Sequence, residues 1–232
     1  MLSPFSSHLG FVGLVHLTFV QNLPAAVIDL FTDGPQSVEI LTSNGAERGA
    51  APVVLTHGLF DYRDLSIQYG AQRASIQEGR LQYTVSPTPT VAKGNNEGYL
   101  DLRYSSSSPV DLLGEGATAF QIKFDYVGAA PQFLFRFYIG NPDSPYPSQA
   151  DLKNYITASS FSGEITIPFS HFSVEDLSRV QFLGIDAARV PMGTSFTISS
   201  ITTVPEPTFP ALASGLALGL LFRRSRPSLR LC

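Results

Sequence analysis

The clearest pattern in the chain is an alternation of apolar and polar residues in two neighbouring segments. In residues 119–126 and again in residues 133–139, every second side chain is large and apolar. Successive side chains of a β-strand point to opposite faces, so each segment is predicted to be a strand with one buried face. Shorter segments of similar character predict further strands at residues 27–31, 36–41, 63–68, 73–77, 81–85, 99–104, 164–167, 180–185 and 195–202.

The two strongest segments are joined by residues 127–132, which contain glycine and proline and are typical of a turn. A hairpin about this turn sets Phe124 opposite Phe135 and Tyr126 opposite Phe133. In that register the apolar faces of the two strands agree. We therefore predict that they pair side by side in one sheet.

The remaining pattern indicates an all-β fold. Residues 63–85 resemble a short meander, and clusters of serine, proline, glycine and asparagine at 105–109 and 141–149 predict connections. Only residues 174–178 suggest a helical turn. Many short strands with turn-rich connections are typical of a single β-sandwich or jelly roll.

Composition excludes several classes of protein. The chain has 232 residues and a net charge of -4, and 15% of its residues are charged, which does not indicate a nucleic-acid-binding surface. Its one cysteine is Cys232, so the predicted domain has no disulfide. Packing, with or without a metal ion, must hold the fold together.

The C-terminal segment, residues 204–232, has a different character from the rest. A Pro-Glu-Pro sequence precedes an apolar run at 209–222, and an arginine cluster at 223–226 follows it. An apolar run followed by arginines acts as a stop-transfer element, because guanidinium groups stay on the cytoplasmic side of a membrane. The alternative is a buried C-terminal helix, which Gly215 and Gly219 disfavour.

This order of features resembles the PEP-CTERM sorting signal of bacterial proteins. The resemblance implies a hydrophobic sorting helix that anchors the chain transiently in the inner membrane. It also implies an exosortase partner that removes the tail, after which the protein reaches the cell surface or the extracellular space. The residues that carry the signal are Pro205, Glu206, Pro207, Arg223, Arg224 and Arg226.

An exported chain needs an N-terminal signal, and residues 1–26 fit one. Residues 9–20 are mostly apolar, and small residues at 25–26 offer a cleavage site. The alternative is that these residues form a first core strand. The predicted organisation is a signal segment at 1–26, a β-sandwich domain at 27–203 and a sorting signal at 204–232.

Three segments of the predicted domain extend the resemblance. Residues 28–36 (Ile-Asp-Leu-Phe-Thr-Asp-Gly-Pro-Gln) are similar to the mature start of many PEP-CTERM proteins, and residues 61–65 and 165–172 are similar to two later segments of them. The resemblance implies a jelly roll related to carbohydrate-binding and galactose-binding-like modules. It also implies an association with exopolysaccharide and biofilm, but no particular reaction.

Catalysis has little support in the sequence. Glycoside hydrolysis needs two carboxylates that face one cleft, and the candidates Asp125, Glu164 and Asp186 are not paired by any motif. We expect Asp125 to offset Lys123 and Arg136 on a solvent face. The histidines of the domain fit no hydrolytic motif, so no catalytic residue is predicted. The alternative remains a jelly-roll enzyme that cleaves polysaccharide, either a glycoside hydrolase or a lyase.

Carbohydrate binding is the first hypothesis. The candidates to stack on sugar rings are Tyr138, Tyr146 and Tyr155, although the chain has no tryptophan. The alternative is that each is an ordinary surface or core tyrosine. Asp29 and Asp186 could contribute to a structural calcium site, but calcium takes six to eight oxygen ligands. We therefore expect an exported, non-catalytic surface or matrix protein that associates with exopolysaccharide.

Overall fold

The structure is a computed structural model that describes residues 26–41, 47–88, 96–114, 116–128, 133–143 and 147–205. These residues belong to one compact unit that spans Leu23–Pro207. The predicted signal segment lies outside the described residues except for Ala26, and the predicted sorting helix lies wholly outside them.

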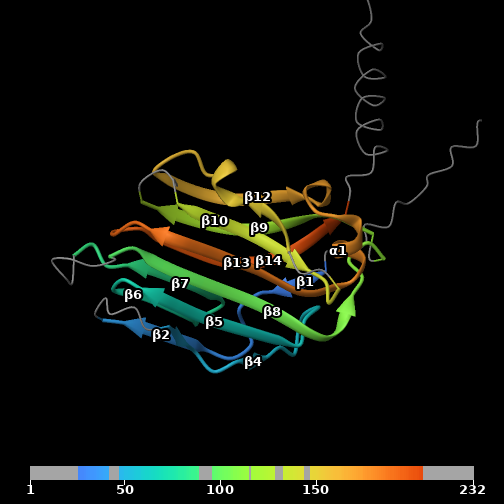
Figure 1. Cartoon of the computed structure of the whole chain (residues 1–232), viewed down its shortest axis with the longest axis horizontal. Helices are drawn as coiled ribbons and strands as arrows, with labels where there is room; N and C mark the ends of the chain where they lie inside the picture. Colours follow the sequence, from blue (N-terminus) through green and yellow to red (C-terminus); the bar gives the residue numbers. More distant parts are fainter. Residues whose placement is uncertain are drawn as a thin grey trace, which may run out of the picture. The chain divides into compact units, whose positions relative to one another are not determined.

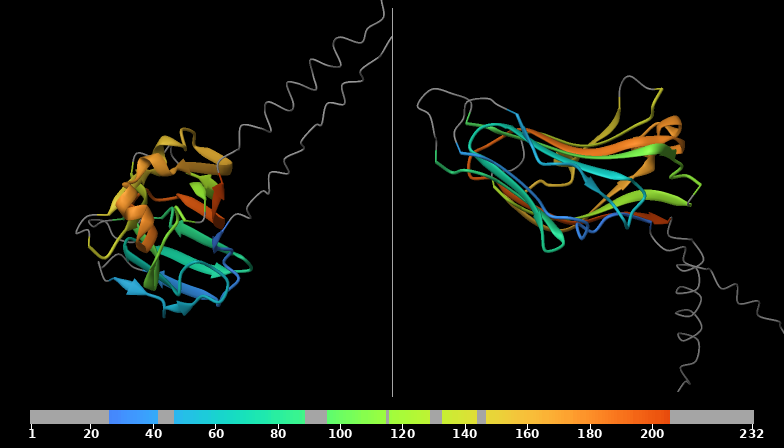
Figure 2. Two further views of the ribbon diagram at one scale, coloured as in Figure 1. Left: turned by 90° about the vertical axis from the view of Figure 1, so that its right-hand side faces the viewer. Right: turned by 90° about the horizontal axis from the view of Figure 1, so that it is seen from below.

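Two antiparallel sheets pack face to face, so the predicted β-sandwich is confirmed (Figures 1 and 2). Sheet A has the strand order β12-β9-β14-β7-β6-β2, with β1 beside β14, and sheet B has the order β11-β10-β13-β8-β5-β3, with β4 beside β5. The strands of sheet A are β1 (Val27–Asp29), β2 (Gln36–Ile40), β6 (Gln72–Gln77), β7 (Arg80–Val85), β9 (Ala117–Val127), β12 (Ser160–Pro168) and β14 (Ser195–Pro205). Those of sheet B are β3 (Arg48–Gly49), β4 (Val53–Val54), β5 (Tyr62–Tyr69), β8 (Gly98–Val110), β10 (Leu134–Gly140), β11 (Ser148–Asp151) and β13 (Val180–Val190).

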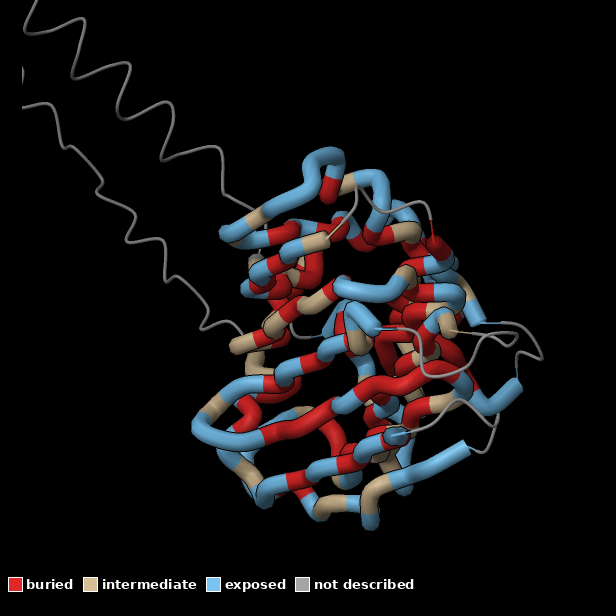
Figure 3. The backbone as a smooth tube through the Cα atoms, turned by 90° about the vertical axis from the view of Figure 1, so that its left-hand side faces the viewer, coloured by how far each residue is buried: buried red, intermediate tan, exposed pale blue. Residues whose placement is uncertain are grey.

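Alternation along the strands places the core between the sheets. Buried and exposed positions alternate visibly along several strands (Figure 3). The middle of the core is aromatic: the ring centroids of Phe120 and Phe137 lie 4.6 Å apart, and those of Phe135 and Phe196 lie 5.3 Å apart. Burying one such side chain stabilises a fold by about 1.5–3 kcal/mol, so these contacts contribute much of the sandwich's cohesion.

The predicted hairpin is wrong, because β9 and β10 lie in different sheets. Strand β9 pairs with β12 and β14, while β10 pairs with β11 and β13. The predicted partners nevertheless meet across the core: the rings of Phe124 and Phe135 are 5.5 Å apart, and those of Tyr126 and Phe133 are 6.5 Å apart. Alternation indicates which face of each strand is buried, but two buried faces can lie side by side in one sheet or face each other across the core, as they do here.

Other predicted elements need smaller corrections. Strand β5 pairs with β8 rather than β6, so only β6 and β7 form the hairpin expected within the meander. The serine run predicted as a connection continues β8 to Val110, and the short strands β3, β4 and β11 were not predicted. The predicted helical turn is α1 (Val174–Ser178), whose N-terminus is capped by Ser173. In the part of the chain that the structure describes, no helix is long and apolar enough to cross a membrane.

Candidate functional site

The outward positions of the two sheets differ in chemistry. In sheet A, strands β7, β9 and β14 present mostly polar and charged side chains: Gln82, Thr84, Gln121, Lys123, Asp125 and Thr197. In sheet B, the register places four aromatic side chains on the outward face: Tyr62, Tyr99, Tyr138 and Phe182. We call the outer surface of sheet B that carries these four residues the aromatic face.

Two of the four rings lie against glycines of the neighbouring strand. A Cβ atom added to Gly184 would fall 2.5 Å from Cζ of Tyr138, and one added to Gly140 would fall 2.7 Å from Cε1 of Phe182. The two rings are neighbours, with centroids 6.2 Å apart and planes inclined at 57°. The absence of side chains at both glycines lets each ring approach the backbone closely.

A cation borders this pair of rings. The guanidinium carbon of Arg103 lies 4.7 Å from the centroid of Phe182, within the range of a cation–π interaction. Arg103 is opposite Gly184 in the register of β8 and β13, so it stands directly beside the two rings. The contact holds Phe182 and Arg103 in a fixed mutual arrangement.

A polar row crosses the sheet next to the rings. Arg136 donates to both carboxylate oxygens of Asp186, one of these bonds measuring 2.9 Å from Nε, and it also donates to Gln149 across 3.0 Å. The hydroxyl of Tyr138 donates to Asp101 across 2.9 Å. Asp101 and Asp186 are direct register partners, so two carboxylates lie side by side on this face.

Burial and charge shift the titration of this row. Burial raises the pKa of the Asp101 carboxyl, and the nearby negative charge of Asp186 raises it further. The hydrogen bond from Tyr138 lowers the same pKa and so opposes both effects in part. Burial, together with the charge of Asp101, raises the pKa of Tyr138 well above its usual value. The hydrogen bond to Asp186 raises the pKa of Arg136. The row therefore keeps a neutral phenol and a charged guanidinium at any physiological pH.

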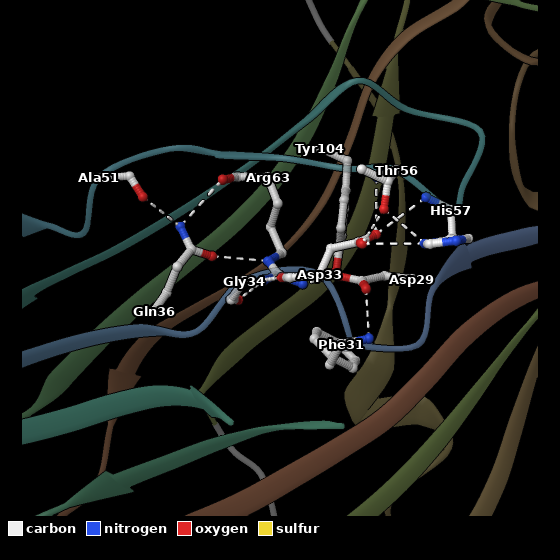
Figure 4. Close-up of polar contacts among 10 residues, drawn as sticks. All are labelled: Asp29, Phe31, Asp33, Gly34, Gln36, Ala51, Thr56, His57, Arg63 and Tyr104. Atoms are coloured by element: carbon white, nitrogen blue, oxygen red, sulfur yellow. Dashed lines mark hydrogen bonds and ion pairs between the residues drawn. The ribbon is translucent and has the colours of Figure 1, made fainter. Parts of the chain in front are cut away.

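A buried arginine ties sheet B to sheet A behind this face (Figure 4). Arg63 of β5 is fully buried, and its Nη1 donates to Asp29 of β1 across 2.7 Å. Its Nε donates to Gln36 of β2 across 2.8 Å, and its Nη2 donates to the carbonyl oxygens of Asp33 and Gly34. The hydroxyl of Tyr104 completes the cluster with a bond to Asp29. A buried ion must be paired in this way to be tolerated.

The cluster joins two of the segments that carried the family resemblance. Asp29 and Gln36 belong to residues 28–36, and Arg63 belongs to residues 61–65. The structure thus gives these motifs a common physical role, because together they fix the position of β5 in sheet B against β1 and β2 in sheet A.

Asp33 forms a second, more exposed arrangement beside the cluster (Figure 4). Its carboxylate accepts the hydroxyl of Thr56 across 2.5 Å and the backbone N–H groups of Thr56 and His57 across 3.1 and 3.2 Å. The Thr56 hydroxyl is the largest cause that lowers the pKa of Asp33 from 3.8 to about 2. His57 itself is largely exposed.

The predicted tyrosines do not form one site. Tyr138 lies on the aromatic face, whereas Tyr155 follows the 3-10 helix at Leu152–Asn154 and lies near His171, with 3.3 Å between its hydroxyl and Nδ1. Tyr146 lies outside the described residues. Only Tyr138 therefore joins the candidate site.

The predicted acidic residues are distributed over both sheets. Asp125 and Glu164 lie on the outer surface of sheet A, where Asp125 accepts a hydrogen bond from Ser162. The expectation that Asp125 offsets Arg136 is wrong, because Arg136 lies in sheet B and pairs with Asp186. The alternation was read correctly, but the two strands belong to different sheets.

The two residues proposed for calcium each have an arginine partner. Asp29 binds Arg63 and lies in sheet A, and Asp186 binds Arg136 and lies in sheet B. Over the described ranges, no cluster of three or more His, Cys, Asp or Glu side chains is suited to hold a metal ion. Of the sorting residues, Glu206, Pro207, Arg223, Arg224 and Arg226 lie outside the described residues, and Pro205 ends β14.

Several residues of the aromatic face were not predicted as site residues, namely Tyr62, Tyr99, Arg103 and Phe182. The sequence contained a signal for Phe182, because the alternation in residues 180–185 sets it on the face opposite Leu183 and Ile185. Nothing in the sequence indicated that β8, β10 and β13 are neighbours, so the residues could not be gathered into one surface.

Comparison with known proteins yields likeness of structure alone. No family model and no curated protein matches the chain. The family 11 carbohydrate-binding module of the cellulase Lic26A-Cel5E of Clostridium thermocellum is similar with a TM-score of 0.40 and 14% identity, over 79% of this chain and 95% of that one. The family 30 module of the cellulase Cel9D-Cel44B of Clostridium thermocellum is similar with a TM-score of 0.39 and 14% identity, over 74% of this chain and 99% of that one. An exo-beta-agarase is similar with a TM-score of 0.37 and 11% identity, over 79% of this chain and 26% of that one.

Proposed function

We propose that the chain is a non-catalytic glycan-binding protein of jelly-roll type and that the aromatic face of sheet B binds the glycan. The observation that supports this most is the gathering of four aromatic side chains on the outward positions of one sheet, while the corresponding strands of the other carry mostly polar and charged groups. Aromatic rings offer an apolar surface to the apolar face of a sugar ring.

The polar row explains how such a face would orient a sugar. Arg136, Asp186 and Asp101 are held by one another and by Tyr138, so their positions are fixed before a ligand arrives. Fixed polar groups lose little conformational entropy on binding. We infer that the aromatic rings contact the apolar face of the sugar and that the side chains of the polar row form hydrogen bonds with its hydroxyl groups.

Affinity electrophoresis of the full chain against soluble polysaccharides tests this proposal. The panel contains mixed-linkage β-glucan, xylan, galactomannan and the exopolysaccharide of the native host. Replacing Phe182→Ala should weaken binding to the retained polymer at least about tenfold, or roughly 1.4 kcal/mol. The matched control is Val127→Ala, an exposed apolar residue of sheet A, which should bind as the unaltered chain does.

Two results would contradict the proposal. One is that no polymer of the panel retards the chain. The other is that a polymer does so but Phe182→Ala and Val127→Ala weaken binding equally, which would place the contact elsewhere.

A second candidate function is polysaccharide hydrolysis, which the adjacent carboxylates of Asp101 and Asp186 favour. Both carboxylates are engaged, however, since Arg136 bonds both oxygens of Asp186 and Tyr138 bonds Asp101. The hydrolysis hypothesis predicts that reducing ends appear when the retained polymer is incubated with the chain and that Asp101→Asn abolishes them. Binding without release of reducing ends is the result expected from our proposal.

We further propose that the protein is exported and sorted through its C-terminal tail by an exosortase, and that its ligand is the exopolysaccharide around the cell. The first and last strands of the described domain lie side by side, and the N–H of Thr203 donates to the carbonyl oxygen of Ala26 across 2.9 Å.

Replacing Pro205-Glu206-Pro207 by alanines in the native host tests the sorting proposal. The altered protein should remain in the membrane fraction with its tail, as determined by intact mass. Release of the altered protein in the normal processed form would contradict the proposal.

A further inference from the structure

Strand β13 contains an irregularity at the end of the aromatic face. The register of β13 against β8 shifts between Ala188 and Val190, and Arg189 between them has a φ of 58°. A positive φ is uncommon for a long side chain and costs free energy. Bulges of this kind bend a strand and re-aim the side chain they contain.

Arg189 lines a hollow of about 580 Å³. The walls include Leu134 and Ala188, which are register partners on the outward face of β10 and β13. Tyr99 of the aromatic face is opposite Ala188 on β8. The hollow therefore adjoins the aromatic face, and the other described residues that line it are Glu97, Phe133 and Pro191.

The arginines of this sheet differ in how they are engaged. Arg63 and Arg136 are bound to aspartates, and Arg103 lies against the ring of Phe182. Arg189 is exposed, and within the described ranges it has no hydrogen bond or ion pair. Arg189 thus has a strained backbone, lines a largely apolar hollow and makes no hydrogen bond to another described residue. Its N–H donors are therefore available to a ligand.

The middle of the aromatic face carries several negatively charged side chains. Asp64, Asp101 and Asp186 all lie on outward positions near the rings. Of the two neighbouring arginines, Arg136 is bound to Asp186, and Arg103 makes a cation–π contact with Phe182. An acidic sugar placed there would meet three carboxylates against two arginines. The hollow has one arginine, Arg189, and one carboxylate, that of Glu97.

We propose that the hollow is a subsite for a uronic acid residue, whose carboxylate is bound by Arg189, while neutral sugar residues occupy the aromatic face. A guanidinium presents two parallel N–H donors that fit a carboxylate. Leu134 and Pro191 contact the apolar face of the same sugar ring. This inference deepens the glycan-binding proposal and rests on it.

Nuclear magnetic resonance titration of the full chain with sodium glucuronate, and separately with glucose, tests the subsite. Glucuronate should shift the backbone resonances of Leu134, Ala188 and Arg189, and glucose at the same concentration should not. Arg189→Gly should weaken the glucuronate response at least tenfold, since glycine adopts the same φ without strain and keeps the fold. Arg189→Lys should retain part of the response because it retains the charge. The matched control is Arg80→Ala, an exposed arginine at the end of β7, which should leave the response unchanged.

Equal responses to glucose and glucuronate would overturn the proposal, as would no response to either. A glucuronate response that survives in Arg189→Gly would overturn the role of Arg189. Failure of the glycan-binding proposal can be distinguished from failure of the subsite proposal. In the former case neutral polymers do not bind the aromatic face, whether or not glucuronate binds in the hollow.

Discussion

The phenol ring of Tyr138 lies over the backbone of Gly184 on the next strand of sheet B. A Cβ at Gly184 would come within 2.5 Å of both Cζ of Tyr138 and the carbonyl oxygen of Leu102. The ring is also tied down by its hydroxyl, which donates to Asp101. Tyr138 is thus fixed at both ends, and Gly184 is required both by this ring and by the close approach of the Leu102 carbonyl on β8.

Gly184→Ala should therefore impair both binding and folding. The added methyl group displaces the Tyr138 ring and presses on the Leu102 carbonyl, so we expect at least a tenfold loss of affinity for the retained polysaccharide. Overpacking of this kind costs about 1–3 kcal/mol of stability. Affinity electrophoresis and thermal unfolding measure the two effects. A variant that binds normally would show that the position of Tyr138 does not matter.

Arg63 and Asp29 should be strongly coupled. Replacing either by leucine leaves the other as an unpaired buried charge, which typically costs about 3–5 kcal/mol. The double replacement removes both charges, so it should cost clearly less than the sum of the two single replacements. Urea unfolding of the four proteins measures this coupling. Additive costs would contradict the direct partnership seen in the structure.

Asp33 should make stability depend on pH in the acidic range. Its pKa falls from 3.8 to about 2 in the folded protein, chiefly because of the Thr56 hydroxyl bond. A carboxyl whose pKa is lowered by folding stabilises the protein above its unfolded pKa, and this contribution is lost as the pH falls from about 4 to about 2. Asp33→Asn should therefore be less stable than the unaltered chain at pH 6, and the difference should shrink toward pH 2. A constant difference over that range would exclude this linkage.

Ionisation of Asp101 should destabilise the fold, whereas ionisation of Asp33 should stabilise it. Burial and Asp186 raise the pKa of Asp101 in the folded protein, so ionisation of Asp101 destabilises the fold at neutral pH. Arg103 and the Tyr138 hydroxyl oppose this effect, while Asp64 adds to it. Asp101→Asn should raise the melting temperature at pH 7 and lose this advantage below the ordinary aspartate pKa of about 3.9. A lower melting temperature at pH 7 would mean that the Tyr138 bond outweighs burial.

Local sequence pattern predicted the strands and the buried face of most of them, but it did not predict which strands are neighbours. Phe124 and Phe135 illustrate the limit: alternation shows correctly that both are buried, and either pairing in one sheet or contact across the core would satisfy it. Arg63 shows a second limit. It alternates in phase with Leu65 and Ile67, so its inward position was visible in the sequence, but its partner Asp29 lies 34 residues away.

Of the candidate site, the sequence predicted Tyr138 as a sugar-binding residue and Asp186 as an acidic candidate, and alternation indicated the outward position of Phe182. Tyr99, Tyr138 and Phe182 come from three strands that are distant in sequence and adjacent in sheet B. Gathering them requires the strand order, which depends on how the whole set of apolar faces is covered. The glycines beneath the rings carry no sequence signal of their own, because a glycine in a strand also fits a bulge or a bend.

The most direct measurement for the central claim is a nuclear magnetic resonance titration of the chain with oligosaccharides of the retained polysaccharide. Binding at the aromatic face predicts that the shifted backbone resonances cluster on β8, β10 and β13, with the largest changes around Gly140, Gly184 and Phe182. The outward positions of β9 and β14 should remain unchanged. Shifts concentrated on sheet A, or spread evenly over both sheets, would contradict the account.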